Sequence, residues 1–75
     1  DKMNEDYSRF LREFRRMTAH LEIKDIAQRM RVTTTTVYSW FNGQSRMNAE
    51  SIIRAIWAFG IDMEVLYHAK WRTLS

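Results

Sequence analysis

The sequence predicts an all-α fold, a compact bundle of about five short helices, and three observations lead to this prediction. The chain contains no proline and only two glycines, Gly43 and Gly60, which lie where apolar helical patterns stop. Apolar residues recur at intervals of three and four, as they do on the buried face of a helix. No segment shows the alternation of apolar and polar residues between turn signals that is typical of a β-strand. A single strand would therefore have no second strand to pair with.

The first helix is expected over residues 5–18, with Asn4 or Asp6 as its N-cap. Its apolar stripe consists of Tyr7, Phe10, Leu11, Phe14 and Met17. In the connection that follows, we expect Leu21 to fold back onto the core.

The opposite face of this helix carries a row of arginines, Arg9, Arg12 and Arg16. Glu5 and Glu13 lie four residues to either side of Arg9, and we expect them to pair with it. We therefore interpret the row as a solvated helix face rather than as a phosphate-binding strip.

Two short helices joined by a tight turn are expected next, over about 23–31 and 33–42. The apolar stripe of the first is Ile26, Ala27 and Met30, and that of the second is Val37, Trp40 and Phe41. Thr33 is suited to cap the start of the second helix, and Gly43 is suited to end it in a left-handed conformation.

The β-branched run from Thr33 to Val37 favours a strand instead, and Asn42-Gly43 would serve as a hairpin turn. We prefer the helix, because burial of the apolar stripe outweighs a propensity penalty of a few tenths of a kcal/mol per residue.

Two more helices are expected in the C-terminal part of the chain. Asn48 caps the first, Gly60 ends it, and its core residues are Ile52, Ala55, Ile56 and Phe59. Asp62 caps the last, and its core residues are Met63, Leu66 and Tyr67.

Ile53 and Trp57 form a second apolar stripe, which is either a partly buried edge or an interface. Together with apolar residues of the last helix, Trp57 makes a candidate surface for a two-fold partner. The candidate interface residues are Trp57, Val65, Ala69 and Trp71.

The two central helices resemble the helix-turn-helix of the lambda-repressor-like family, of the Cro and phage-repressor type. The resemblance is carried by Ile26-Ala27, Met30, Val32-Thr33, Val37 and Trp40-Phe41-Asn42-Gly43. It covers roughly residues 9–67, and because single positions are degenerate, its specificity lies in their combined spacing. It implies a cytoplasmic, sequence-specific DNA-binding transcriptional regulator that binds a double-stranded operator as a homodimer.

In a repressor-like dock the second helix of the motif enters the major groove, where hydroxyl groups bond base edges. The candidate base contacts are Thr34, Thr35, Tyr38 and Ser39. The candidate phosphate contacts are Lys24, Arg31, Thr33, Asn42, Arg46 and Asn48. In the competing interpretation, the threonines at 33–36 only cap the helix and form a polar surface without a binding function. An exposed Tyr38 is harder to explain in that way.

The chain departs from the family pattern at three places. Glu22-Ile23 stands where Thr-Gln is frequent, and a carboxylate repels phosphate, so Lys24 would have to compensate. Arg31 replaces the usual glycine of the turn, at a cost of about 1 kcal/mol if its backbone is left-handed. Phe41 replaces the acidic partner of Arg15, so we expect no buried ion pair there.

Composition excludes several classes of function. There is no cysteine, and no apolar run approaches the ~20 residues of a membrane span. His20 and His68 are isolated, so we expect no metal, no cofactor, no small-molecule substrate and no enzymatic activity. The net charge of +3 suits an anionic partner, but a charge of this size is also common in domains without one.

We expect one domain, residues 3–75, with 1–2 as a tag remnant and 72–75 as a frayed tail.

A second interpretation stays open, in which the scaffold is a protein-interaction module such as an antirepressor or an antitoxin-type partner of another regulator. Glu22 and the uncharged outer face of the second motif helix favour it. Tyr38, Trp57 and Trp71 would then contact the partner protein.

Overall fold

The computed structural model describes residues 2–62, and these form four α-helices without any strand. The helices are α1 (Lys2–Thr18), α2 (Ile23–Met30), α3 (Thr34–Asn42) and α4 (Ala49–Phe59). The all-α class is confirmed, and the β-branched run forms a helix rather than a strand. Four helices are therefore observed instead of about five, and the fifth that we expected falls at 63–75, outside the described residues.

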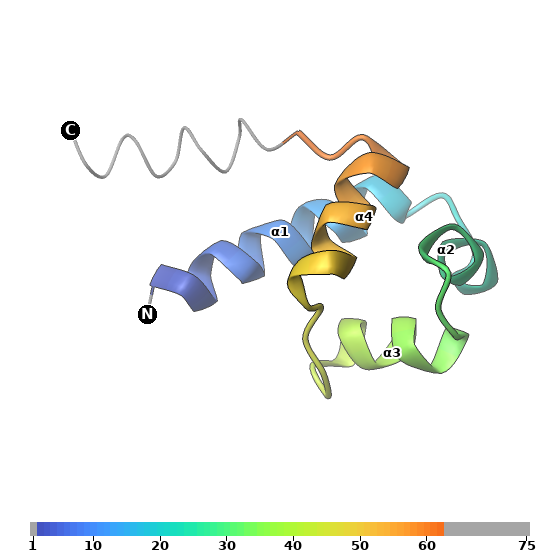
Figure 1. Cartoon of the computed structure of the whole chain (residues 1–75), viewed down its shortest axis with the longest axis horizontal. Helices are drawn as coiled ribbons and strands as arrows, with labels where there is room; N and C mark the ends of the chain where they lie inside the picture. Colours follow the sequence, from blue (N-terminus) through green and yellow to red (C-terminus); the bar gives the residue numbers. More distant parts are fainter. Residues whose placement is uncertain (1, 63–75) are drawn as a thin grey trace.

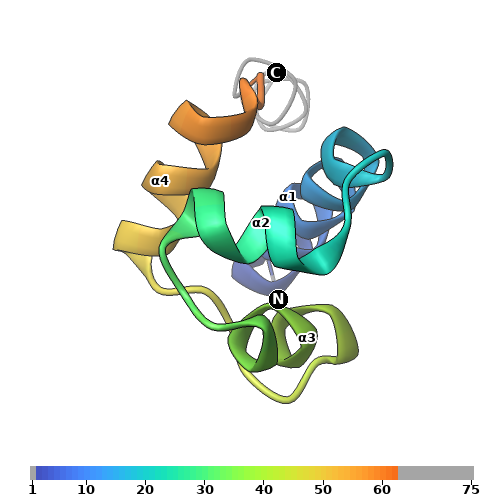
Figure 2. The ribbon, with the colours of Figure 1, turned by 90° about the vertical axis from the view of Figure 1, so that its right-hand side faces the viewer.

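The helices are arranged so that α3 has one open side. α2 packs against both α3 and α4, and α1 packs against α4. In Figures 1 and 2, α3 lies at the bottom of both views, below the other three helices, and the turn after α2 leads directly into it. One side of α3 thus faces the core and the other faces solvent.

The core is built around the aromatic ring of Phe14, which is fully buried. Its centroid lies 6.4 Å from that of Trp40 and 5.5 Å from that of Phe59, and both rings meet it edge-on. Phe41 is also close, at 5.7 Å. Edge-to-face pairs add about 0.5–1.5 kcal/mol each to the burial of their area. The apolar stripes predicted for α1, α3 and α4 therefore meet at one residue.

α1 differs from the prediction at its start and in its ion pairs. It begins at Lys2, so Asn4 and Asp6 lie within the helix and neither caps it. Glu13 accepts hydrogen bonds from Arg16, one of them 2.9 Å long, instead of pairing with Arg9. The hydrogen bond from Arg16 lowers the pKa of the Glu13 carboxyl group. The pairing with Arg9 was wrong because a partner three residues away on the same face competes for the same carboxylate.

α2 ends in a left-handed turn at Arg31, whose φ is 58°. The backbone N–H of Arg31 bonds to the carbonyl of Gln28 at 3.2 Å, and that of Val32 bonds to Ala27 at 3.0 Å. This pattern satisfies the last carbonyl groups of the helix. Arg54 of α4 adds a bond of 3.0 Å from its guanidinium to the carbonyl of Met30. The end of α2 is thereby held to α4.

α4 begins and ends where the sequence predicted. The side-chain oxygen of Asn48 accepts a hydrogen bond of 2.8 Å from the backbone of Ser51, and Gly60 is left-handed with φ 65°. Ile53 and Trp57 lie on the solvent side of α4, 56% and 85% exposed. Their stripe is therefore a surface rather than a partly buried edge. Across residues 2–62, no helix has both the length and the apolar character needed to cross a bilayer.

Replacing Arg31 by glycine is expected to raise the free energy of unfolding by about 0.5–1 kcal/mol, because glycine adopts a positive φ without a Cβ clash. The matched control is Gln28→Gly, at an exposed position inside α2, which is expected to lower it by about 1 kcal/mol. Urea denaturation measures both changes. An Arg31→Gly variant less stable than the parent would show that the left-handed backbone at Arg31 is not strained.

Candidate nucleic-acid interface

The outward face of α3 carries hydroxyl groups and no charge. Thr34 and Thr35 are exposed in its first turn, and Tyr38 is 56% exposed one turn later. Val37 and Trp40 are buried on the opposite side. Three of the four residues predicted to contact bases thus share one solvent-facing strip.

The first turn of α3 is held by Thr33. Its hydroxyl accepts a hydrogen bond of 3.2 Å from the backbone N–H of Thr36 and lies 2.9 Å from the hydroxyl of Thr36. This N-cap satisfies one of the N–H groups that a helix start leaves unpaired. The capping role predicted for Thr33 is confirmed, and it explains how a threonine run forms a helix.

Ser39, the fourth base-contact candidate, uses its hydroxyl within the chain. It is half-buried, and its hydroxyl donates a bond of 2.7 Å to the carbonyl of Thr36. The same hydroxyl lies 2.6 Å from that of Ser45. Ser39 therefore holds the loop that follows α3.

The three cationic candidates for phosphate contacts come from different parts of the chain. Lys24 is exposed near the start of α2, with its amino group 3.3 Å from the carboxylate of Glu22. Arg31 is exposed at the turn before α3. Arg46 lies in the loop after α3, with its guanidinium carbon 4.3 Å from the ring centroid of Tyr7. Glu22 thus offsets part of the charge that Lys24 contributes.

Asn42 and Asn48, two further phosphate-contact candidates, use their side-chain oxygens within the chain. The Asn42 oxygen accepts a bond of 3.0 Å from the backbone N–H of Gln44, and Asn48 caps α4 as described above. The donor group of a carboxamide is its NH₂, which is the part suited to a phosphate oxygen.

Two contacts in this region were not foreseen from the sequence. The hydroxyl of Tyr7 accepts a bond of 3.0 Å from the backbone N–H of Met47. Together with Arg46 above its ring, Tyr7 fixes the loop after α3 to α1. The partners are 40 residues apart in the chain, and no local pattern of residue types signals such a pair.

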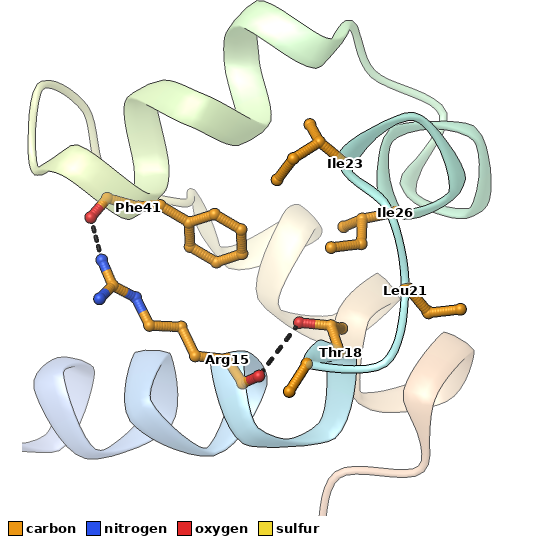
Figure 3. Close-up of a pocket in the computed structure, with 7 residues that line it drawn as sticks. Arg15, Thr18, Leu21, Ile23, Ile26 and Phe41 are labelled. Atoms are coloured by element: carbon orange, nitrogen blue, oxygen red, sulfur yellow. Dashed lines mark hydrogen bonds between the residues drawn. The ribbon is translucent and has the colours of Figure 1, made fainter.

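Arg15 and Phe41 join α1 to the end of α3 (Figure 3). The Arg15 guanidinium donates a hydrogen bond to the carbonyl of Phe41, and its central carbon lies 5.2 Å from the Phe41 ring centroid. No carboxylate among residues 2–62 forms an ion pair with Arg15. A backbone carbonyl and an aromatic face are thus the contacts of the Arg15 guanidinium.

The remaining candidates are only partly described. Trp57 is exposed on α4, whereas Val65, Ala69 and Trp71 lie outside the described residues. His20 is exposed, and His68 also lies outside the described part. Residues 2–62 contain no cluster of three side chains that would hold a metal ion.

Comparison with known proteins adds no relative: no protein-family model, no curated protein and no solved structure matches this chain significantly. The assignment of function therefore rests on the residues and geometry described above.

Thr33→Ala removes the capping hydroxyl and is expected to lower the free energy of unfolding by about 1 kcal/mol, the usual cost of losing an N-cap. Thr33→Ser keeps the hydroxyl and is expected to stay near the parent value. Thr34→Ala, at the neighbouring exposed position, is expected to change stability by less than about 0.5 kcal/mol. Equal stabilities of Thr33→Ala and Thr34→Ala in urea denaturation would show that the cap is unimportant.

Proposed function

We propose that this protein is a sequence-specific DNA-binding transcriptional regulator of the lambda-repressor-like kind, similar to Cro and phage repressors. In this proposal α2, the turn at residues 31–33 and α3 act as a helix-turn-helix, and α3 enters the major groove. Two copies bind successive grooves of a near-palindromic operator, and the exposed Trp57 contributes to the contact between them.

The observation that carries the proposal is the solvent-facing strip of α3. Thr34, Thr35 and Tyr38 are exposed together on the side of the helix away from the core. Hydroxyl groups donate to and accept from base edges, and threonine methyls pack against the methyl of thymine. An exposed tyrosine ring in this position is well explained by a partner surface that covers it.

Phosphate contacts would come from the cations at the edges of α3. Lys24 lies in α2, Arg31 in the turn before α3 and Arg46 in the loop after it, and long cationic side chains of this kind suit contacts with the DNA backbone. Neutralisation of phosphates supplies much of the affinity of such proteins. Because Glu22 sits beside Lys24, we expect the contribution from the start of α2 to be weak.

Binding to duplex DNA enriched from a random pool is expected to weaken steeply with added salt, by a slope of about 0.9 per neutralised phosphate. Arg46→Ala is expected to reduce the slope by about one unit, and Arg46→Lys, which keeps the charge, to retain it. Fluorescence anisotropy across a salt series measures both slopes, and circular dichroism checks that the helices persist. No enrichment of any sequence, or binding insensitive to salt, would overturn the proposal.

A second candidate function, a protein-interaction module, is favoured by the apolar surface of α4. Trp57 is 85% exposed, and Ile53, one turn earlier, is 56% exposed. Large aromatic side chains in such positions are typical anchors of protein interfaces. Under this alternative the partner is another regulatory protein, and Tyr38 on α3 provides a second anchor.

If a protein is the partner, its capture from an extract of the source organism is expected to survive nuclease treatment and to be lost in Trp57→Ala or Tyr38→Ala. Both side chains are mostly exposed, so the helical circular dichroism is expected to stay intact. Gln28→Ala, an exposed polar position on α2, is the matched control. Undiminished capture by both aromatic variants would rule out this alternative.

A further inference from the structure

A pocket of about 320 Å³ opens between the end of α1, the start of α2 and the end of α3 (Figure 3). It is lined by Arg15, Thr18, Ala19, Leu21, Ile23, Ile26 and Phe41. At about 30 Å³ for each water molecule, this space corresponds to roughly ten waters. Its volume lies at the lower end of the range of about 300–1,000 Å³ found for small-molecule sites.

The α2 side of the pocket is apolar, whereas α1 contributes the polar side chains of Arg15 and Thr18. Ile23 and Ile26 of α2 point toward the Phe41 ring across the space between α2 and α3 (Figure 3). Thr18 is buried, and its hydroxyl donates to the carbonyl of Phe14 at 2.7 Å and lies 3.4 Å from that of Arg15. The hydroxyl is thus occupied within α1, and the hydrocarbon surface offered to a ligand comes from the isoleucines of α2 and the Phe41 ring.

The one cationic group of the lining is the guanidinium of Arg15. It donates to the carbonyl of Phe41, and it forms no ion pair with a carboxylate of residues 2–62. A guanidinium has five N–H donors in a planar fork, which matches the two oxygens of a carboxylate. Two acidic residues, Glu22 and Asp25, adjoin lining residues in the sequence, and Glu22 is paired with Lys24.

We propose that this pocket binds a small organic carboxylate of roughly ten non-hydrogen atoms in total, most of them in an apolar body. The carboxylate bonds to the Arg15 guanidinium, and the apolar body lies against Ile23, Ile26 and the ring of Phe41. This inference goes beyond the proposed function, and its test uses the free protein without DNA.

The probe is phenylacetate, titrated into the full ¹⁵N-labelled chain and followed by two-dimensional NMR. We expect saturable shifts of the backbone amides of Thr18, Ala19, Ile23 and Phe41, with a dissociation constant on the order of millimolar for so small a ligand. Phenylacetamide, which has nearly the same shape without the charge, is expected to bind at least about tenfold more weakly.

Arg15→Gln is expected to weaken phenylacetate binding by at least about tenfold, whereas Arg12→Gln, an exposed arginine on the same helix, is expected to leave it unchanged. Ala19→Trp, at an exposed position of the lining, narrows the pocket while keeping Arg15, and it is expected to abolish binding. This second variant keeps the test decisive if Arg15→Gln does not fold. Absence of saturable shifts at the lining, equal binding of the amide, or undiminished binding by Ala19→Trp would overturn the inference.

Discussion

The side chain of Phe14 lies where α1, α3 and α4 meet, and the orientation of α3 depends on it. The ring is fully buried, with Trp40 and Phe59 edge-on to it and Phe41 beside it. Successive residues of a helix are rotated by about 100°, so burial of Val37 and Trp40 on one side of α3 directs the opposite side away from the core. The exposure of Tyr38 and of the threonines before it is therefore a consequence of packing in the core.

Side chains that bond to backbone groups complete the arrangement at the helix ends. Arg54 donates to the carbonyl of Met30 in the last turn of α2, and Arg15 donates to the carbonyl of Phe41 in the last turn of α3. The last carbonyls of a helix have no partner within it and attract cations. Two arginines from other helices thus fix the ends of the two helices on either side of the turn, and this limits the movement of α3 relative to the rest.

The chemistry of α3 differs between its two sides, and this difference underlies the proposals made for it. Its outer strip offers hydroxyl groups without charge, so specificity toward DNA would come from hydrogen bonds and methyl contacts, and affinity from cations outside the helix. The same neutrality would suit an apolar protein surface. Phe41, in the C-terminal turn of α3, lines the pocket between α1, α2 and α3 together with Arg15. In these proposals, one short helix contributes both the surface for a macromolecule and one wall of the pocket for a small ligand.

By itself, the sequence determined the elements that depend on neighbouring residues. The Thr33 and Asn48 caps, the left-handed glycines and the apolar stripe around Phe14 were all predicted, because capping and helical periodicity act within a few residues. Only the tertiary structure decided which distant groups meet. Ser39 turns toward Ser45, and Arg15 finds the carbonyl of Phe41. Such contacts depend on how the chain folds back on itself, and local patterns of residue types do not predict which distant residues will meet.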